Sequence, residues 1–353
     1  MSKTQIFRHL LEQGWLSEDG AYVVVDGQYG STGKGVLTGL LAECYGDDID
    51  WVTSNAGPNS GHTSFYGDEK IVLKQLPTYP VVAWKRKMVV PAYLNAGAII
   101  DMDTLLDECR THQMDVHLHP HAALIRDEDL ADDKKRISSI GSTGKGTGAA
   151  LASKIGRDPE AVVGYKDLDP THIRLMSTFG NEVFDKGVGL VEVSQGFSLG
   201  LNSGFYPYTT SRECTVMQAL SDARIHPSRY RQSMMVVRTY PIRVAGTSGP
   251  CYPDQKEIDW EMLGQEPELT TVTQKVRRVF TWSDQQFQDA VRTNKPEHIF
   301  VNFMNYLENF EVDIDDWVRF HIIEQYGRVM NDVPKTVLLG FGPNSSDVRL
   351  WQS

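Results

Sequence analysis

The hydrophobic positions near the N-terminus predict a helix, a strand and a second helix, in that order. Ile6, Leu10 and Leu11 recur at helical spacing, which indicates a short amphipathic helix ahead of the core. Residues 21–25 form an unbroken apolar run typical of a buried strand, and residues 36–42 continue as a helix after a glycine-rich turn. Strand, glycine loop and helix in this order aim backbone N–H groups and a helix N-terminus at an anion.

The same alternation of strands and helices continues along the chain. Apolar runs predict further strands at 87–90, 188–193, 234–237, 298–303 and 336–339, and helical spacing predicts helices at 102–112 and 315–326. This order favours an α/β fold, in which helices cover both faces of a mostly parallel central sheet. No low-complexity linker divides the chain, so we expect one large domain over residues 1–353, with residues 1–20 as an N-terminal extension.

Composition and charge narrow the possible partners. The net charge of −11 argues against a general nucleic-acid binder, which needs a basic surface to neutralise phosphates. The four cysteines show no C-x-x-C pairing, so neither a zinc site nor a disulfide framework is expected. Charges interrupt the first twenty residues, and no apolar run approaches membrane-spanning length. We therefore expect no signal peptide, no membrane association and a cytoplasmic location.

The glycine-rich turn after the first strand is the first candidate for chemistry. It reads Gly30, Ser31, Thr32, Gly33, Lys34, Gly35. A strict P-loop needs glycine at position 28 and serine or threonine at position 35, and neither is present. The glycines still let a backbone approach a phosphate, and Lys34 supplies a positive charge. The hexapeptide recurs at 141–146, but its flanks do not match, so we interpret it as coincidence or as two separate glycine-rich loops and not as an architectural repeat.

Several further motifs, read in order, resemble those of adenylosuccinate synthetase. They are Asn-Ser-Gly-His-Thr at 59–63, the loop at 140–148 followed by Lys154 and Arg157, Glu-Val-Ser-Gln-Gly at 192–196, Tyr-Pro-Tyr-Thr-Thr-Ser at 206–211, Thr-Val-Thr-Gln-Lys-Val-Arg-Arg-Val at 271–279, and Gly-Phe-Gly-Pro at 340–343. Together with the glycine loop they cover most of the chain, from about residue 22 to 343. Chance similarity in all of them is very improbable.

The resemblance implies a ligase that phosphorylates O6 of a 6-oxopurine nucleotide and then replaces the phosphate with the amine of aspartate. It implies Ser31 and His62 as catalytic positions and Mg²⁺ as cofactor at Ser31 and Gly61. For the ATP or dATP donor it implies Gly30, Ser31, Thr32, Gly33, Lys34, Gly35, Gly61, His62, Thr63, Phe303, Asn305, Gly340, Gly342 and Pro343. For the acceptor nucleotide it implies Ser31, Lys34, Asn59, Ser142, Thr143, Arg157, Gln195 and Thr210, and for aspartate Thr271, Val272, Thr273, Lys275 and Arg277. Arg157 occupies the position that reaches the neighbouring subunit in this family, which implies a homodimer.

Ser31 is the most informative departure from the family pattern, because it replaces the aspartate that removes the N1 proton. A serine hydroxyl is a poor base at neutral pH. Its short side chain leaves space beside C2, where guanine carries an amino group, and its oxygen can accept a hydrogen bond from that group. The acceptor of the N1 proton stays open between Asp26 and a water held by Ser31, and a turn-capping role is the alternative for Asp26.

Two other departures concern the donor and aspartate. Asn305 replaces the family's guanine-reading aspartate, and its acceptor and donor suit adenine, so we expect ATP or dATP. Lys275 replaces an arginine and loses bidentate geometry. The altered C2 space and donor resemble the bacteriophage branch of this family, which joins aspartate to dGMP for 2-aminoadenine DNA. The alternatives are an ordinary member using IMP and a non-catalytic nucleotide-binding, ATPase-like protein.

Overall fold

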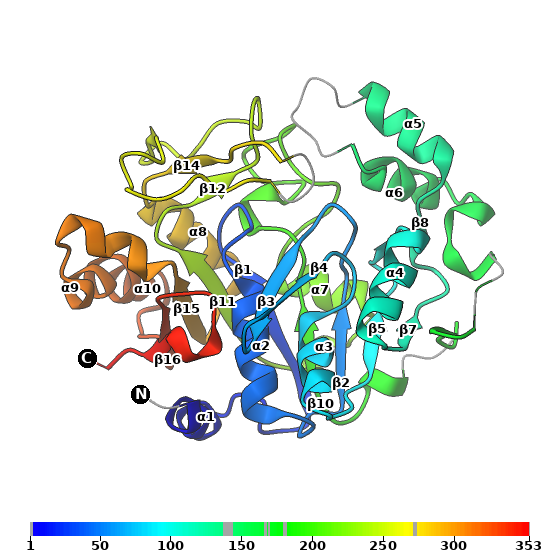
Figure 1. Ribbon diagram of the computed structural model, residues 1–353, viewed down its shortest axis with the longest axis horizontal. Helices are drawn as coiled ribbons and strands as arrows, with labels where there is room; N and C mark the ends of the chain where they lie inside the picture. The colour runs from blue at the N-terminus through cyan, green and yellow to red at the C-terminus, as the bar shows by residue number, and fades with distance from the viewer. Residues whose placement is uncertain are drawn as a thin grey trace.

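The computed structural model describes residues 3–136, 144–165, 168, 170–178, 182–270 and 274–352. Its centre is a ten-stranded sheet in the order β17-β16-β15-β11-β1-β10-β2-β5-β7-β9 (Figure 1). The strands are β1 Gly20–Asp26, β2 Trp51–Ser54, β5 Ala92–Leu94, β7 Val116–Leu118, β9 Ile173–Leu175, β10 Val188–Glu192, β11 Tyr230–Arg238, β15 His298–Asn302, β16 Thr336–Gly340 and β17 Val348–Leu350. All neighbours pair in parallel except β16 and β17, which confirms the predicted mostly parallel sheet.

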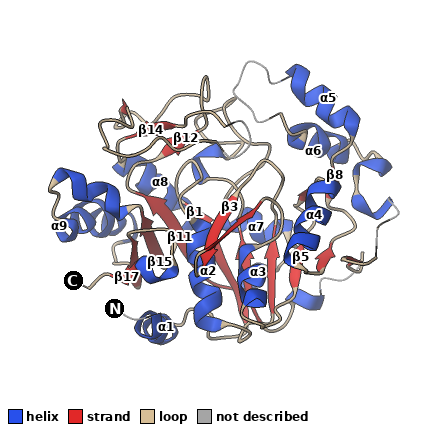
Figure 2. Ribbon diagram, in the orientation of Figure 1, coloured by secondary structure: helices blue, strands red, loops and turns tan. Residues whose placement is uncertain are grey.

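Helices cover both faces of this sheet, as expected (Figure 2). They are α1 Lys3–Glu12, α2 Lys34–Tyr45, α3 Thr78–Lys85, α4 Met102–His112, α5 Asp127–Arg136, α6 Thr147–Ile155, α7 Val216–Asp222, α8 Asp284–Asn294, α9 Ile314–Val318 and α10 Glu324–Met330. Alternate residues of a strand point to opposite faces. In β1, Tyr22 and Val24 join one apolar core with α2 and α3, whereas Val23 and Val25 join a second with α7 and α8.

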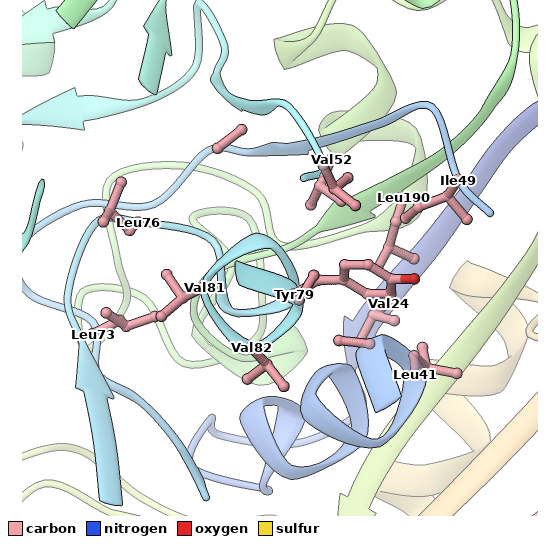
Figure 3. Close-up of a cluster of buried hydrophobic side chains, with 14 of the residues drawn as sticks. Val24, Leu41, Ile49, Val52, Leu73, Leu76, Tyr79, Val81, Val82 and Leu190 are labelled. Carbon is pink, nitrogen blue, oxygen red and sulfur yellow. The ribbon is translucent and has the colours of Figure 1, made fainter. Parts of the chain in front are cut away.

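The first of these cores packs α2 and α3 against the middle of the sheet. Figure 3 shows Tyr79 of α3 extending toward Val24 and Leu190 of the sheet and Leu41 of α2. All four side chains are completely or almost completely buried. The Tyr79 hydroxyl donates to the Gly46 carbonyl at 3.0 Å, so the ring keeps a partner for its polar end while its body is buried. This packing fixes α2, whose N-terminus carries the glycine loop.

One predicted strand is wrong. Residues 87–90 form no strand, because α3 continues to Lys85 and the chain then turns through Lys87 in a left-handed conformation (φ 62°). Pairing with β2 begins at Ala92 in β5, after Pro91. The apolar run that suggested the strand includes Val89, which is 69% exposed.

The other predicted elements are confirmed with small changes of length. The N-terminal helix is α1, with Ile6 and Leu10 buried. The helix predicted at 102–112 is α4, and the one predicted at 315–326 runs through α9, a π-helical segment Arg319–Ile323 and α10. None of the helices within the described ranges has the length and apolar composition that a bilayer crossing requires.

Two small sheets stand beside the carboxyl ends of the central strands. The hairpin of β3 (His62–Tyr66) and β4 (Glu69–Leu73) packs on α2. A second sheet joins β12 (Ile242–Arg243), β14 (Arg278–Phe280) and β13 (Glu257–Ile258), in the upper left of Figure 1. In parallel sheets, ligands bind outside the carboxyl ends of the strands. The loops after β1, β11, β15 and β16 meet there.

A buried histidine in the sheet makes folding stability depend on pH. His298 of β15 is completely buried, its Nε2 lies 2.8 Å from Gln232 Oε1, and burial lowers its pKa to about 3. Below pH 6.5 the unfolded chain binds a proton here and the folded chain does not, so stability falls as pH drops from about 6.5 toward 3.

The substitution His298→Gln should make folding stability less dependent on pH. Between pH 7 and pH 5, the free energy of unfolding should fall by about 2 kcal/mol less in the variant than in the wild type, at about 1.36 kcal/mol for each pH unit below 6.5. Urea unfolding of both proteins at the two pH values checks this, and equal losses would contradict it.

Candidate functional site

A cavity of about 700 Å³ opens at the carboxyl ends of the central strands. Its lining comes from the glycine loop, the β3–β4 hairpin, the segment before β14 and the loops after β15 and β16. The lining residues are Ser31, Thr32, Gly33, Lys34, Gly35, Val36, Gly61, His62, Thr63, Phe65, Lys70, Val72, Gln265, Glu268, Leu269, Gln274, Arg277, Asn302, Phe303, Asn305, Tyr306, Gly342 and Pro343. Twelve of the fourteen predicted donor residues, together with Asn302, the start of α2 and Arg277, are therefore gathered around one space.

The glycine loop leads into α2 through backbone conformations that a side chain disfavours. Gly30 has φ 85° and Gly33, which precedes the first residue of α2, has φ 94°. A methyl group on Gly33 would collide with Asn302 Nδ2, and one on Gly35 would collide with the Thr63 carbonyl. The glycines therefore allow the loop to press against the hairpin and the β15 loop, and the N-terminus of α2 at the cavity wall is suited to binding an anion.

Asp26, the last residue of β1, organises the loop from inside. Its Oδ1 accepts from the backbone N–H groups of Gln28 (2.8 Å) and Gly30 (3.1 Å), and its Oδ2 accepts from the Thr32 hydroxyl and from Lys34 Nζ (2.9 Å). The side chain is 1% exposed. With four donors around it, this carboxylate caps the turn, which favours the capping interpretation over a role as the base.

Lys34 connects the glycine loop to the predicted acceptor-nucleotide residues. Its Nζ donates to the Gln195 carbonyl at 2.8 Å, and Gln195 Nε2 donates to Asn59 Oδ1 at 3.1 Å. Gln195 has φ 66°, and the adjacent Gly196 lies so close to Gly30 that an added methyl group would collide with it. Lys34, Gln195 and Asn59 therefore form one connected group beside the loop.

The remaining predicted acceptor residues are placed less closely together. Thr210 lies in the turn before α7, where its N–H donates to the Leu199 carbonyl at 2.7 Å. Arg157 follows α6 and is exposed, with φ 63°. Neither lines the cavity. Ser142 and Thr143 lie outside the described residues.

His62 is a neutral hydrogen-bonding group in the cavity wall. Burial, reinforced by the nearby Lys34 charge, lowers the pKa of His62 to about 3. Its Nε2 is buried and has no hydrogen-bond partner among the described residues. A buried polar atom without a partner carries a cost of about 1–3 kcal/mol, which a ligand atom bonded to it removes. His62 is thus poised to donate to a bound group without carrying charge.

The wall opposite the hairpin contains the predicted base-binding residues. Phe303 has φ 61°, a rare conformation for an aromatic residue, and it lines the cavity with Asn305. Gly342 and Pro343 line it from the loop after β16. Gly340 ends β16 and lies against Asn302, where a methyl group would collide with the amide oxygen. A flat ring and an amide side by side suit the face and edge of a base.

The predicted aspartate residues are only partly described. Arg277 lines the cavity, its backbone N–H donates to the Glu268 carbonyl at 2.9 Å, and burial lowers its pKa. Lys275 is exposed and does not line the cavity. Thr271, Val272 and Thr273 lie outside the described residues.

Sequence reasoning missed the most buried charge at the site. Arg238, the last residue of β11, is completely buried and pairs with Glu268 at the cavity wall. The signal that could have identified Arg238 is a charged residue at the carboxyl end of an apolar strand, where ligands bind in parallel sheets. Glu268 and the exposed Lys70 of β4 carry no comparable signal, because their segments have no motif.

The oxygen atoms near the loop suit Mg²⁺ when a nucleotide supplies most of its ligands. Ser31 and Gly61 are exposed and line the cavity beside Lys34 and His62. Within the described ranges, no three His, Cys, Asp or Glu side chains gather into a metal site of their own. Mg²⁺ is commonly held by one or two protein oxygens, substrate phosphates and water, so this sparse set of oxygens fits it.

Comparison with known proteins agrees with these features. The family model of adenylosuccinate synthetase matches residues 23–174 and 160–336. The N6-succino-2-amino-2'-deoxyadenylate synthase of Vibrio phage phiVC8 is 38% identical over 344 residues, covering 93% of this chain and 97% of the phage protein. An adenylosuccinate synthetase from Thermococcus sibiricus is 31% identical over 277 residues, covering 76% of this chain and 78% of its own.

A solved structure extends the similarity to three dimensions. It is the succinoaminodeoxyadenylate synthetase of cyanophage S-2L, bound to dGMP and to dATP as an energy donor. The two chains share 32% identity with a TM-score of 0.81, over 95% of this chain and 96% of the cyanophage protein.

Proposed function

The chain belongs to the adenylosuccinate synthetase family, and from this membership we propose that it joins L-aspartate to C6 of dGMP at the expense of ATP or dATP. The product is N6-succino-2-amino-2'-deoxyadenylate, released with ADP or dADP and phosphate. The observation that carries the choice of dGMP is Ser31, a short side chain exposed to the cavity at the position of the family's catalytic aspartate. The phage relatives named for this product support the same choice.

The reaction divides into two displacements. O6 of dGMP attacks the γ-phosphorus of the donor and the nucleoside diphosphate leaves, giving a 6-phosphoryl nucleotide. The aspartate amine then attacks C6, phosphate leaves, and the nitrogen loses its extra proton. Lys34 and the N–H groups at the start of α2 hold the phosphates, and neutral His62 donates a hydrogen bond where charge develops. Ser31 and Gly61 would hold Mg²⁺ beside the phosphates, and the ion would supply positive charge that offsets part of the phosphate charge.

The N1 proton of guanine needs an acceptor, and the geometry favours water over Asp26. The Asp26 carboxylate already accepts four hydrogen bonds within the loop, including one from Lys34. Its protonation would break the contacts that shape the phosphate site. Ser31 is exposed, so a water held by its hydroxyl would be open to solvent and would pass the proton on.

The assembly of the full site requires a second subunit in this proposal. Arg157 is exposed, follows α6 and does not line the cavity of its own chain, as a residue that serves a neighbouring site would be placed. We therefore propose a homodimer in which Arg157 binds the dGMP phosphate of the partner. The reaction uses soluble metabolites, and we place it in the cytoplasm of the host cell.

The donor preference leads to a prediction for Asn305. Its amide can accept from N6 of adenine and donate to N1, whereas a carboxylate accepts from both N1–H and the 2-amino group of guanine. We expect Asn305→Asp to favour GTP over ATP by about tenfold or more, because each exchanged hydrogen bond is worth about 0.5–1.5 kcal/mol. The kcat/KM values for the two donors measure this. Asn305→Ala is the matched control, which should weaken ATP use with no gain for GTP.

A substrate panel tests the proposed function as a whole. The purified protein is offered dGMP, GMP or IMP with ATP, dATP or GTP, with and without L-aspartate, and phosphate release and product mass are measured. Aspartate-dependent turnover of dGMP with ATP or dATP supports the proposal. Turnover of IMP with GTP and none of dGMP would identify an ordinary adenylosuccinate synthetase. Nucleotide binding without aspartate-dependent phosphate release would identify a non-catalytic relative.

A further inference from the structure

Arg238 touches three separate walls of the cavity with one side chain. Its Nη1 donates to the Ser31 carbonyl at 3.0 Å, and its guanidinium carbon lies 3.7 Å from the centre of the Phe303 ring. The same guanidinium pairs with both carboxylate oxygens of Glu268. The Arg238 backbone also exchanges two hydrogen bonds with the Gln28 side chain, at 2.9 and 3.0 Å. The guanidinium therefore contacts the glycine loop, the base wall and the segment that leads to the aspartate residues.

Two hydrogen bonds from the end of β11 and the residue after it hold strained backbone in place. Ser31 (φ 55°) and Phe303 (φ 61°) are non-glycine residues in the left-handed region. Such residues cost about 1–3 kcal/mol each and persist only where the surroundings hold them. Arg238 binds the Ser31 carbonyl, and the next residue, Thr239, donates its hydroxyl to the Phe303 carbonyl at 2.7 Å. The end of β11 thus fixes both residues that we assign to nucleotide binding.

Glu268 connects Arg238 to Arg277, one of the residues predicted to bind aspartate. Its carboxylate accepts from Arg238 and, at 3.1 Å, from the Tyr306 hydroxyl, while its carbonyl accepts from the Arg277 backbone at 2.9 Å. Burial opposes its charge, but Arg238 outweighs burial and lowers the pKa of Glu268. Glu268 is therefore ionised beside Arg238. Loss of Glu268 leaves the completely buried guanidinium without its counter-ion, and loss of Arg238 leaves the half-buried Glu268 carboxylate without one.

We propose that Arg238 and Glu268 are a positioning pair that couples donor-nucleotide binding to aspartate binding. A donor base stacked on Phe303 restrains the ring against Arg238, which restrains Glu268 and the segment that follows it. A ligand that orders this network lowers the ordering cost for the second ligand, so each strengthens the binding of the other. The assignment of the second ligand as aspartate rests on the proposed function.

The coupling is measured by titrating the full-length protein with β,γ-methylene-ATP in the presence of dGMP and Mg²⁺, with and without saturating L-aspartate. For the wild type we expect aspartate to tighten donor binding by at least about fivefold, the lower end of usual coupling between sites. The coupling ratio is the Kd of the donor analogue without aspartate divided by its Kd with aspartate. We expect this ratio to fall to about one in Glu268→Gln, in Arg238→Met and in the double variant, because each of them breaks the contact between Arg238 and Glu268. The double variant removes both charges, so it tests the link even where a single variant fails to fold.

Glu257→Gln is the matched control. Glu257 forms a two-point pair with Arg278 of β14, at 2.7 and 2.6 Å, close in sequence to Arg277 but outside the cavity lining. It should leave the ratio unchanged. A wild-type ratio of one, or a ratio preserved in the double variant, would overturn the coupling. Loss of the ratio in Glu257→Gln as well would also overturn it, by showing that any nearby ion pair has this effect. Failure of dGMP turnover in the substrate panel separately identifies failure of the proposed function.

Discussion

Replacement of Ser31 with aspartate is expected to lower kcat/KM for dGMP by about 10- to 100-fold. The longer carboxylate enters the space that the 2-amino group of guanine needs, and overpacking of this kind costs about 1–3 kcal/mol, with 1.36 kcal/mol for each tenfold change in rate. The backbone tolerates the change, because aspartate is one of the residues enriched in the left-handed region that Ser31 occupies at φ 55°. The loss therefore reports on the nucleotide and not on a damaged loop.

The same substitution should create activity with IMP, because it restores a carboxylate beside N1 where no 2-amino group is present. Steady-state kinetics with dGMP and IMP measure both changes. Ser31→Ala separates space from hydrogen bonding. It keeps the space and removes the hydroxyl, which accepts from the 2-amino group and holds the proton-accepting water. It should therefore lower dGMP use by about tenfold for each hydrogen bond lost, without creating activity with IMP. Undiminished use of dGMP by Ser31→Asp would refute the account of substrate choice.

Removal of the His62 side chain is expected to have the largest effect on kcat. Loss of one preorganised donor to developing charge costs about 10²–10³ in kcat, and His62→Ala should fall in that range. His62 remains neutral at every working pH because its pKa is about 3. A neutral amide can therefore replace part of its function, and His62→Gln should recover a measurable share of the lost rate.

The pH dependence of kcat provides a separate check on the state of His62. If His62 acted in its protonated, imidazolium form, kcat would increase as pH falls through about 6.5, and His62→Gln would lack this increase. We expect the wild-type and His62→Gln profiles to have the same shape between pH 5.5 and 8. A limb near pH 6.5 in the wild type alone would show that His62 acts in its charged form.

The fold could be predicted largely because its strands are buried on both faces. Runs such as residues 234–237 and 337–339 are continuously apolar, which distinguishes them from surface elements. The failure at residues 87–90 has the same origin, since an apolar run in a turn after a helix has the composition of a strand. The sequence also does not reveal that α9 and α10 join through a π-helical segment, because that feature depends on tertiary packing.

The candidate site, like the fold, could be predicted from the sequence only in part. Residues in local motifs, such as Lys34 and His62, could be placed together because the motifs themselves define their surroundings. The pairing of Arg238 with Glu268 could not be predicted, because the two residues are 30 positions apart and neither belongs to a motif, although Arg238 alone stands at the end of an apolar strand. Their importance depends on a buried contact that only the folded chain creates.

The contact between Lys34 and Asp26 has a consequence for how the protein attracts its nucleotides. In the described structure the lysine charge is already offset by the adjacent carboxylate at 2.9 Å. The phosphates therefore meet a loop whose ionic charges nearly cancel, and the attraction that remains comes from fixed N–H dipoles at the start of α2. Dipoles act over a short range, so nucleotide capture should be governed by fit within the cavity, with little long-range steering and a shallow dependence on salt concentration. Although the chain has a net charge of −11, nucleotide recognition should therefore depend on contacts within the cavity.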